Sequence, residues 1–172
     1  MNKEELTRDK VLSMPSGTEM DTLVAEMVMG WHKGGFVSWT GMRTVRDDED
    51  WLDADGRYMC GVPQEDMYED DEDFNLLHWH PSQSIIWAWQ VVEKLEERGW
   101  YFEVRNNPPD VGFSVNIRDK KHGTWDMNGN YDDWIEADAR GESVPHAICR
   151  AALLAMLEEI RCDSNQKELD SH

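Results

Sequence analysis

The segment PHAICRAALLAML, residues 145–157, decides how this chain folds. Pro145 suits the first turn of a helix that opens at Ser143. Apolar residues occupy nearly every side of this helix, whereas a helix at the protein surface carries them on one stripe. We therefore predict that this helix is the best buried helix of the fold. The polar residues that follow Arg161 predict a frayed tail.

A second helix is predicted from apolar residues that share one helical face. Thr18 and Asp21 have the spacing of a capping box at its start, with Asp in place of the usual Glu. Gly30 supplies a stop signal at its end. The apolar face between these signals consists of Met20, Leu23, Val24, Met27, Val28 and Trp31.

A third helix is predicted after His80-Pro81, and a short one near the N-terminus. Ser82 or Ser84 is the expected cap of the third helix, and Gly99 ends it. The short helix occupies residues 3–13 and stops before Pro15. The apolar face of the third helix consists of Ile85, Ala88, Trp89, Val92 and Leu95.

Strands are predicted where apolar and polar residues alternate. One strand occupies 100–104 and its antiparallel partner 113–117, with a turn at 106–110 between them. Residues 124–127 give a third strand before a turn at 128–129, and 36–39 and 57–62 are shorter candidates. Short connections favour antiparallel pairing, and helices bracket the strands in the sequence. We predict an α+β fold in which an antiparallel sheet is sandwiched between helices, in α/β/α layers.

The length of 172 residues predicts one domain. We place it at 1–162, with an acidic insert at 47–73 and a flexible tail at 163–172. Three cysteines make no disulfide framework and favour a reducing compartment. The charged N-terminus is unlike a signal peptide, and no apolar run has the length of a membrane span. We expect a soluble, cytoplasmic protein.

The acidic insert is the most unusual feature of the composition. It holds thirteen carboxylates against one basic residue, Arg57, in a chain of net charge −19. Such a surface repels nucleic acid and anionic membranes and attracts basic protein surfaces. Carboxylates fixed in space would imitate nucleic-acid phosphates and fill a basic groove, whereas a solvated loop would not. The expected partner-binding residues are Asp47, Asp48, Glu49, Asp50, Glu69, Asp70, Asp71, Glu72 and Asp73.

No catalytic or cofactor motif accompanies the insert. Nucleophile-elbow, P-loop and dinucleotide-binding patterns are missing, and Cys149 lies on the apolar helix, where a thiol behaves as a small hydrophobe. His78 and His80 would need Cys60 or nearby acids to complete a zinc site. Residues 126–132 begin like a calcium loop but lack its glycine and its final glutamate, so a turn explains them better. We predict no enzyme activity, no catalytic residues, no metal and no cofactor.

Nine tryptophans are more than a core of this size needs. Trp31, Trp89 and Trp100 fit buried positions. Most of the others are expected to pack under loops: Trp39, Trp51, Trp79, Trp125 and Trp134. Alternatively, aromatic rings could stack a planar base while a basic side chain pairs its phosphate. The candidates for that pairing are Arg43, Arg46, Arg105, Arg118 and Lys121.

Three segments resemble the phage ABA sandwich domain family. They are LSMPSGTEMDTLVAEMVMGW at 12–31, AWQVVEKL at 88–95 and PHAICRAALLA at 145–155. The resemblance covers about residues 11–160 and implies a helix/sheet/helix sandwich encoded by bacteriophages or prophages. It brings no catalytic residues with it. The acidic insert is heavier than the resemblance implies and indicates a specialised role.

The resemblance and the charge together lead to a functional hypothesis. We expect a non-enzymatic phage protein of the host cytosol that acts in counter-defence by binding and inhibiting a basic, nucleic-acid-binding immune protein of the host. The alternative is a sponge for a small nucleotide signal, with its site at the interface of a homo-oligomer. A metal-dependent hydrolase using His78 and His80 ranks last, and an accessory protein whose acidity serves only solubility stays open.

Overall fold

The computed structural model describes residues 6–33, 51–55, 79–106, 112–119, 124–125, 131–132 and 136–169. Its helices are α1 (Arg8–Ser13), α2 (Thr18–Val24), the π-helical turn η2 (Ala25–Met29), α3 (Ile85–Glu97) and α4 (Val144–Leu169). Its longer strands are β3 (Trp100–Asn106), β4 (Phe113–Asp119) and β7 (Glu136–Gly141). The short strands are β1 (His32–Lys33), β2 (Trp51–Leu52), β5 (Thr124–Trp125) and β6 (Tyr131–Asp132).

The main sheet is antiparallel, in the order β3-β4-β7. The predicted pairing of the strands at 100–104 and 113–117 is confirmed, with Phe102 opposite Ile117 and Val104 opposite Val115. The third strand of this sheet is β7, which the sequence analysis did not predict. The predicted strand at 124–127 is present as β5, but it pairs with β6 in a separate two-stranded ladder.

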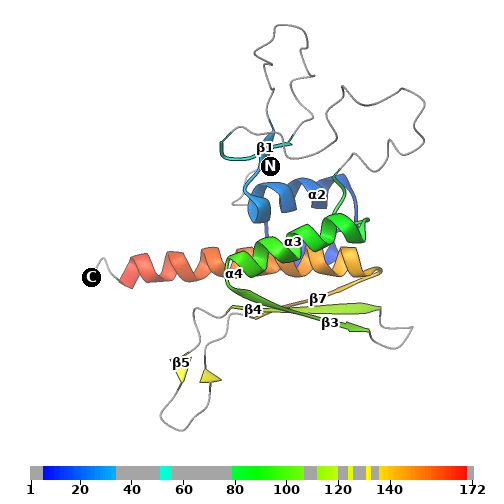
Figure 1. The fold of residues 1–172 in the computed structure, drawn as a ribbon. Coiled ribbons are helices and arrows are strands. Elements are labelled where there is room, and N and C mark those ends of the chain that lie inside the picture. The colour runs from blue at the N-terminus through cyan, green and yellow to red at the C-terminus, as the bar shows by residue number, and fades with distance from the viewer. Residues whose placement is uncertain are drawn as a thin grey trace, which may run out of the picture.

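Helix α4 is the centre of the molecule. Figure 1 shows α3 and α4 between the sheet on one side and α2 on the other, and α4 contacts β4 and β7 as well as α1, α2 and α3. From 147 to 153, every residue of α4 is buried except Arg150, which is partly exposed. The residues that α4 adds to the buried core are Ala147, Ile148, Cys149, Ala151, Ala152, Leu153, Leu154, Ala155 and Met156. The prediction that this helix is the best buried is confirmed. It continues to Leu169, well past the predicted end near Arg161.

The predicted second helix is confirmed, but its N-terminus is built differently. Gly17 is the N-cap, and Thr18 is already the first helical residue, so the capping-box prediction was wrong. The carboxylate of Asp21 bonds elsewhere, to Ser82 and His80, which lie far away in sequence. At the other end, Gly30 stops η2 with φ of 74°, as predicted for a left-handed C-cap.

Helix α3 is rotated relative to the prediction. Its buried residues are Ala88, Val91, Val92 and Leu95. Ile85 and Trp89 were assigned to the apolar face, but about half of each side chain is exposed. The reason is that α3 packs on α4, β3 and η2, so its buried face is centred between Ala88 and Val92. Ser84 is the N-cap, although its side chain makes no capping hydrogen bond.

The α+β class, with an antiparallel sheet and packed helices, is confirmed. Within the described residues the layers run from α2 through α3 and α4 to the main sheet, as Figure 1 shows. The candidate strands at 36–39 and 57–62 and the turn at 128–129 lie outside the described residues. Within the part of the chain that the structure describes, every helix is too short or too polar to cross a membrane.

Candidate functional site

The nine predicted partner-binding residues, at 47–50 and 69–73, all lie outside the residues that the structure describes. The structure does describe two points that hold this acidic insert to the domain. One lies within it, at β2, and the other follows it, at Trp79. Because they attach the acidic insert to the domain, we treat these two anchors as the candidate functional site within the described residues.

The first anchor is the ladder between β1 and β2. Lys33 is opposite Trp51 and His32 is opposite Leu52. Trp51 and Leu52 are buried, and the ammonium of Lys33 lies 5.2 Å from the centroid of the Trp51 ring. A cation over an indole face is attracted by the negative charge of that face, which adds to the ladder. Just after β2, the carboxylate of Asp53 accepts a hydrogen bond from the backbone N–H of Asp55 at 2.9 Å, which turns the chain.

The second anchor is a pair of tryptophans. The ring centroids of Trp31 and Trp79 are 4.8 Å apart with planes tilted by 58°, and both side chains are buried. Since Trp31 directly precedes β1, three consecutive residues, 31–33, hold both anchors. Trp51 and Trp79 were expected under loops, and the structure places both in buried positions at this junction.

A buried polar clamp follows the second anchor and joins it to α2. Asp21 accepts a hydrogen bond from the backbone N–H of Ser82 at 2.8 Å, and its other oxygen lies 3.3 Å from Nδ1 of His80. The Ser82 hydroxyl accepts from the backbone N–H of Gly17 at 2.8 Å, which satisfies one donor of the helix start. Burial raises the pKa of Asp21, and the hydrogen bonds from Ser82 and His80 oppose that rise.

The clamp gives a first prediction. Asp21→Ala leaves the buried N–H of Ser82 without its acceptor, so we expect a loss of about 1–3 kcal/mol in the free energy of unfolding. Asp21→Asn is the matched control, because its amide oxygen can still accept that bond, and it should lose clearly less. Urea unfolding followed by tryptophan fluorescence measures both. Equal losses would show that the Ser82 bond is not what matters.

The same clamp has a pH signature. The raised pKa of Asp21 means that the folded state binds this proton more tightly than the unfolded state does. Its contribution to stability is therefore fully present below the ordinary carboxyl pKa and is lost as the pH rises through the raised value. Asp21→Asn should remove this part of the pH dependence.

A second buried polar cluster ties α1 to α4. The carbonyl oxygen of Met14 accepts from Nε2 of His146 at 3.0 Å and from Nε and Nη2 of Arg150 at 3.2 and 2.6 Å. Arg150 also donates to the carbonyl of Arg140 on β7 at 2.8 Å. Burial lowers the pKa of His146, so this donor is the neutral imidazole. The cluster is structural, because every contact it makes joins one backbone segment to another.

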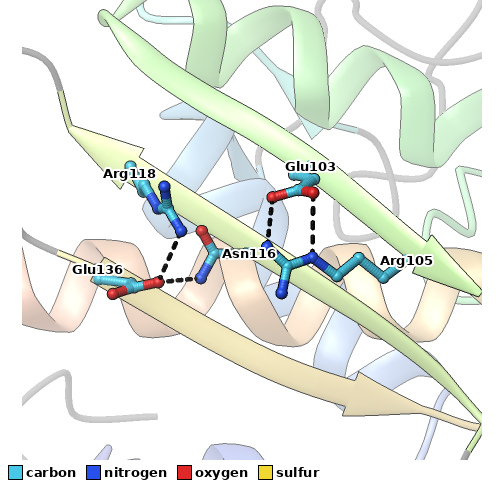
Figure 2. A network of polar contacts seen from close by, with 5 residues as sticks. All are labelled: Glu103, Arg105, Asn116, Arg118 and Glu136. Carbon is cyan, nitrogen blue, oxygen red and sulfur yellow. Dashed lines mark hydrogen bonds and ion pairs between the residues drawn. The ribbon is translucent and has the colours of Figure 1, made fainter. Parts of the chain in front are cut away.

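The outer face of the sheet carries a charged network. Glu103 and Arg105 on β3 form two hydrogen bonds, at 2.8 and 3.0 Å. Arg118 and Asn116 on β4 both donate to Glu136 on β7, and the arginine lies 3.4 Å from it. Figure 2 shows all five side chains on one side of the sheet, with α4 on the other. The bond with Arg105 lowers the pKa of Glu103, so this carboxylate stays ionised at neutral pH.

Two residues of the nucleotide hypothesis, Arg105 and Arg118, therefore do lie on one face, but each already pairs with a glutamate. The other three basic candidates, Arg43, Arg46 and Lys121, lie outside the described residues. Trp31 and Trp100 are buried as predicted and offer no exposed ring face for stacking a base. Trp89 is half exposed, but its ring meets Phe102 on the helix side of the sheet, away from the two arginines.

The structure also does not bring together the residues of the metal hypothesis. His80 faces Asp21, whereas His78 and Cys60 are not described. Among the described residues, no group of three histidine, cysteine or acidic side chains is placed to hold a metal ion. Cys149 is fully buried on α4, and burial raises the pKa of its thiol, as expected for a cysteine that packs as a hydrophobe.

Comparisons with known proteins give one family and one similar structure. The model of the family described as phage ABA sandwich domain matches residues 22–153. A 2.0 Å crystal structure of a phage protein from Bacillus cereus ATCC 14579 is similar, with a TM-score of 0.44 and 22% sequence identity over 90% of this chain and 96% of that one. Among curated proteins, none matches this chain.

Proposed function

Because the chain belongs to the phage ABA sandwich domain family, we propose that it is a non-enzymatic phage protein that acts in counter-defence by binding a basic protein of the host. The observation that carries the proposal is the acidic insert, with thirteen carboxylates and one arginine between residues 47 and 73. A surface of this charge would attract a nucleic-acid-binding protein and compete with its natural ligand.

The anchors at 31–33 support a binding role for the insert. An acidic segment held at Trp51–Leu52 and again at Trp79 loses less conformational freedom on binding than a tail attached at one end. Trp31, Trp51, Leu52 and Trp79 at these anchors are apolar and buried, so they serve attachment and leave recognition to the carboxylates.

The described cations also favour an acidic surface over a phosphate-binding one. Ion pairs with glutamates occupy most of the described basic side chains: Arg8, Lys10, Lys94, Arg98, Arg105, Arg118 and Arg161. Arg150 donates to backbone carbonyls instead. A nucleotide phosphate would have to break such pairs before it could bind, which is why we place the nucleotide sponge second.

A pull-down from bacterial host lysate at low and high salt tests the proposal. We expect capture of a basic, nucleic-acid-binding protein at low salt and its release at high salt, because screening weakens contacts between exposed charges. The test variant carries Asp70→Asn, Asp71→Asn, Glu72→Gln and Asp73→Asn, and it should lose the captured protein.

The matched control changes net charge by the same amount elsewhere. It carries Asp9→Asn, Glu19→Gln, Glu93→Gln and Glu96→Gln, four exposed positions on the described helices. It should retain the captured protein. Capture that resists salt, or that survives neutralisation of 70–73, would contradict the proposal. A nucleotide retained without a protein partner, identified by mass spectrometry, would favour the sponge instead.

A further inference from the structure

Strand β3 lies at one edge of the main sheet, and of the described strands only β4 pairs with it. Its seven residues, 100–106, pair with β4 along one side of the strand, and the other side forms an edge of the main sheet. Natural proteins protect such an edge or use it to add a strand from another chain. The side chains on and beside β3 indicate which of these applies here.

On the helix side of the sheet, this edge is bordered by exposed apolar side chains. The exposed fractions are 49% for Ile85, 63% for Ile86, 50% for Trp89 and 39% for Val104. Trp89 meets the partly buried Phe102 edge to face, with ring centroids 6.4 Å apart. Ile85 lies one helical turn before Trp89 on α3, and Val104 lies two residues after Phe102 on β3. Together, Ile85, Ile86, Trp89 and Val104 form an apolar strip along the edge.

On the outer side, the edge carries two opposite charges two residues apart, Glu103 and Arg105, both more than half exposed. If a second copy of β3 pairs antiparallel about a two-fold axis, the residue on the axis lies opposite itself. The residue before it then lies opposite the residue after it in the other copy. Centring the axis on Val104 puts Glu103 opposite Arg105 of the other copy, twice. Centring it on Glu103 or on Arg105 puts like charges opposite each other, which is destabilising. Of these three registers, only the one centred on Val104 places opposite charges opposite each other.

We propose that the chain forms a homodimer in which two β3 strands pair antiparallel, centred on Val104, to make a continuous six-stranded sheet. A two-fold axis perpendicular to the sheet keeps both α3 helices on the same face. The apolar strips, with Ile85, Ile86 and Trp89, then meet across the axis and are removed from water. The four charges of Glu103 and Arg105 form a neutral network on the opposite face. The proposal concerns other residues than those of the acidic insert and does not depend on the function proposed above.

The test is a charge swap read by sedimentation equilibrium of the full chain. The salt concentration is set at about 0.15 M, where the Debye length is about 8 Å and long-range repulsion between two acidic protomers is screened. Wild type should sediment as a concentration-dependent dimer. Glu103→Arg alone, or Arg105→Glu alone, places like charges opposite each other and should weaken the dimer about tenfold or more. Thermal unfolding of each variant checks that the monomer still folds.

Two further samples distinguish this register from a general effect of charge. The double variant Glu103→Arg/Arg105→Glu restores opposite charges and should recover the dimer. A one-to-one mixture of the two single variants should form a heterodimer, since one copy then carries arginine at both positions and faces glutamate at both positions of the other. A wild-type monomer at millimolar concentration would overturn the proposal. So would a dimer indifferent to the single changes, or one that neither the double variant nor the mixture restores.

Discussion

Replacing Ile148 by alanine is expected to lower the free energy of unfolding by about 2–5 kcal/mol, the largest effect of any single truncation considered for this protein. Ile148 is fully buried on α4, the helix that contacts the sheet, α3 and the N-terminal helices together. Removing its side-chain carbons loses their transfer free energy and leaves a cavity. The surrounding elements cannot fill that cavity without shifting several interfaces at once.

The same helix supplies the control for this change. Ile160 lies three turns further along α4 and is 50% exposed. Ile160→Ala removes the same atoms but leaves no cavity, so its effect should stay within about 0.5 kcal/mol. Urea unfolding followed by tryptophan fluorescence gives both values. If the two variants lost similar amounts, α4 would not be the buried centre of the fold.

Replacing Gly141 by alanine is the second change with a large expected effect. Gly141 ends β7, and a Cβ added there would collide with the backbone nitrogen of Ala147 and lie 2.9 Å from its Cα. These are backbone atoms in the first turns of α4, so relief requires the strand and the helix to move apart. Overpacking of a core commonly costs about 1–3 kcal/mol, and a collision with backbone belongs at the upper end or above it.

Gly30→Ala separates this collision from the general cost of losing a glycine. Gly30 has φ of 74°, and an added Cβ would meet nothing within 4 Å. Its cost is conformational only and should be about 1 kcal/mol. Chemical denaturation of the two variants should therefore rank Gly141→Ala clearly below Gly30→Ala in stability. The reverse order would mean that β7 and α4 are not in close contact.

The close approach at Gly141 also explains why β7 was missed. The strand reads EADARG, with exposed Glu136, Asp138 and Arg140 alternating with buried Ala137, Ala139 and Gly141. The alternation is present, but its inward residues are alanine and glycine, which carry little β-propensity. They are small because α4 packs directly against this strand. A search for alternation that counted alanine as an inward residue could have found it.

The residues at the anchors also show which features local sequence predicts and which depend on long-range contacts. Repeating apolar spacing located α2 and η2 up to Gly30, because that information is local to one helix. The partner of Asp21 is a backbone N–H at Ser82, and the partner of Trp31 is Trp79. Each pair is separated by tens of residues that carry no signal of the contact. The residues around Asp21 predict a capping box, whereas in the structure its carboxylate accepts a hydrogen bond from the distant Ser82.

The sequence by itself determined the helices, the pairing of β3 with β4, the burial of α4 and the acidic character of the chain, since periodicity, turn residues and charge act over a few neighbouring residues. Only the tertiary structure decided which face of α3 is buried, where β7 joins the sheet, and how residues 31–33 hold the acidic insert. Those features depend on contacts between distant segments. Their free energy comes from close packing and buried hydrogen bonds that exist only once the helices and the sheet have come together.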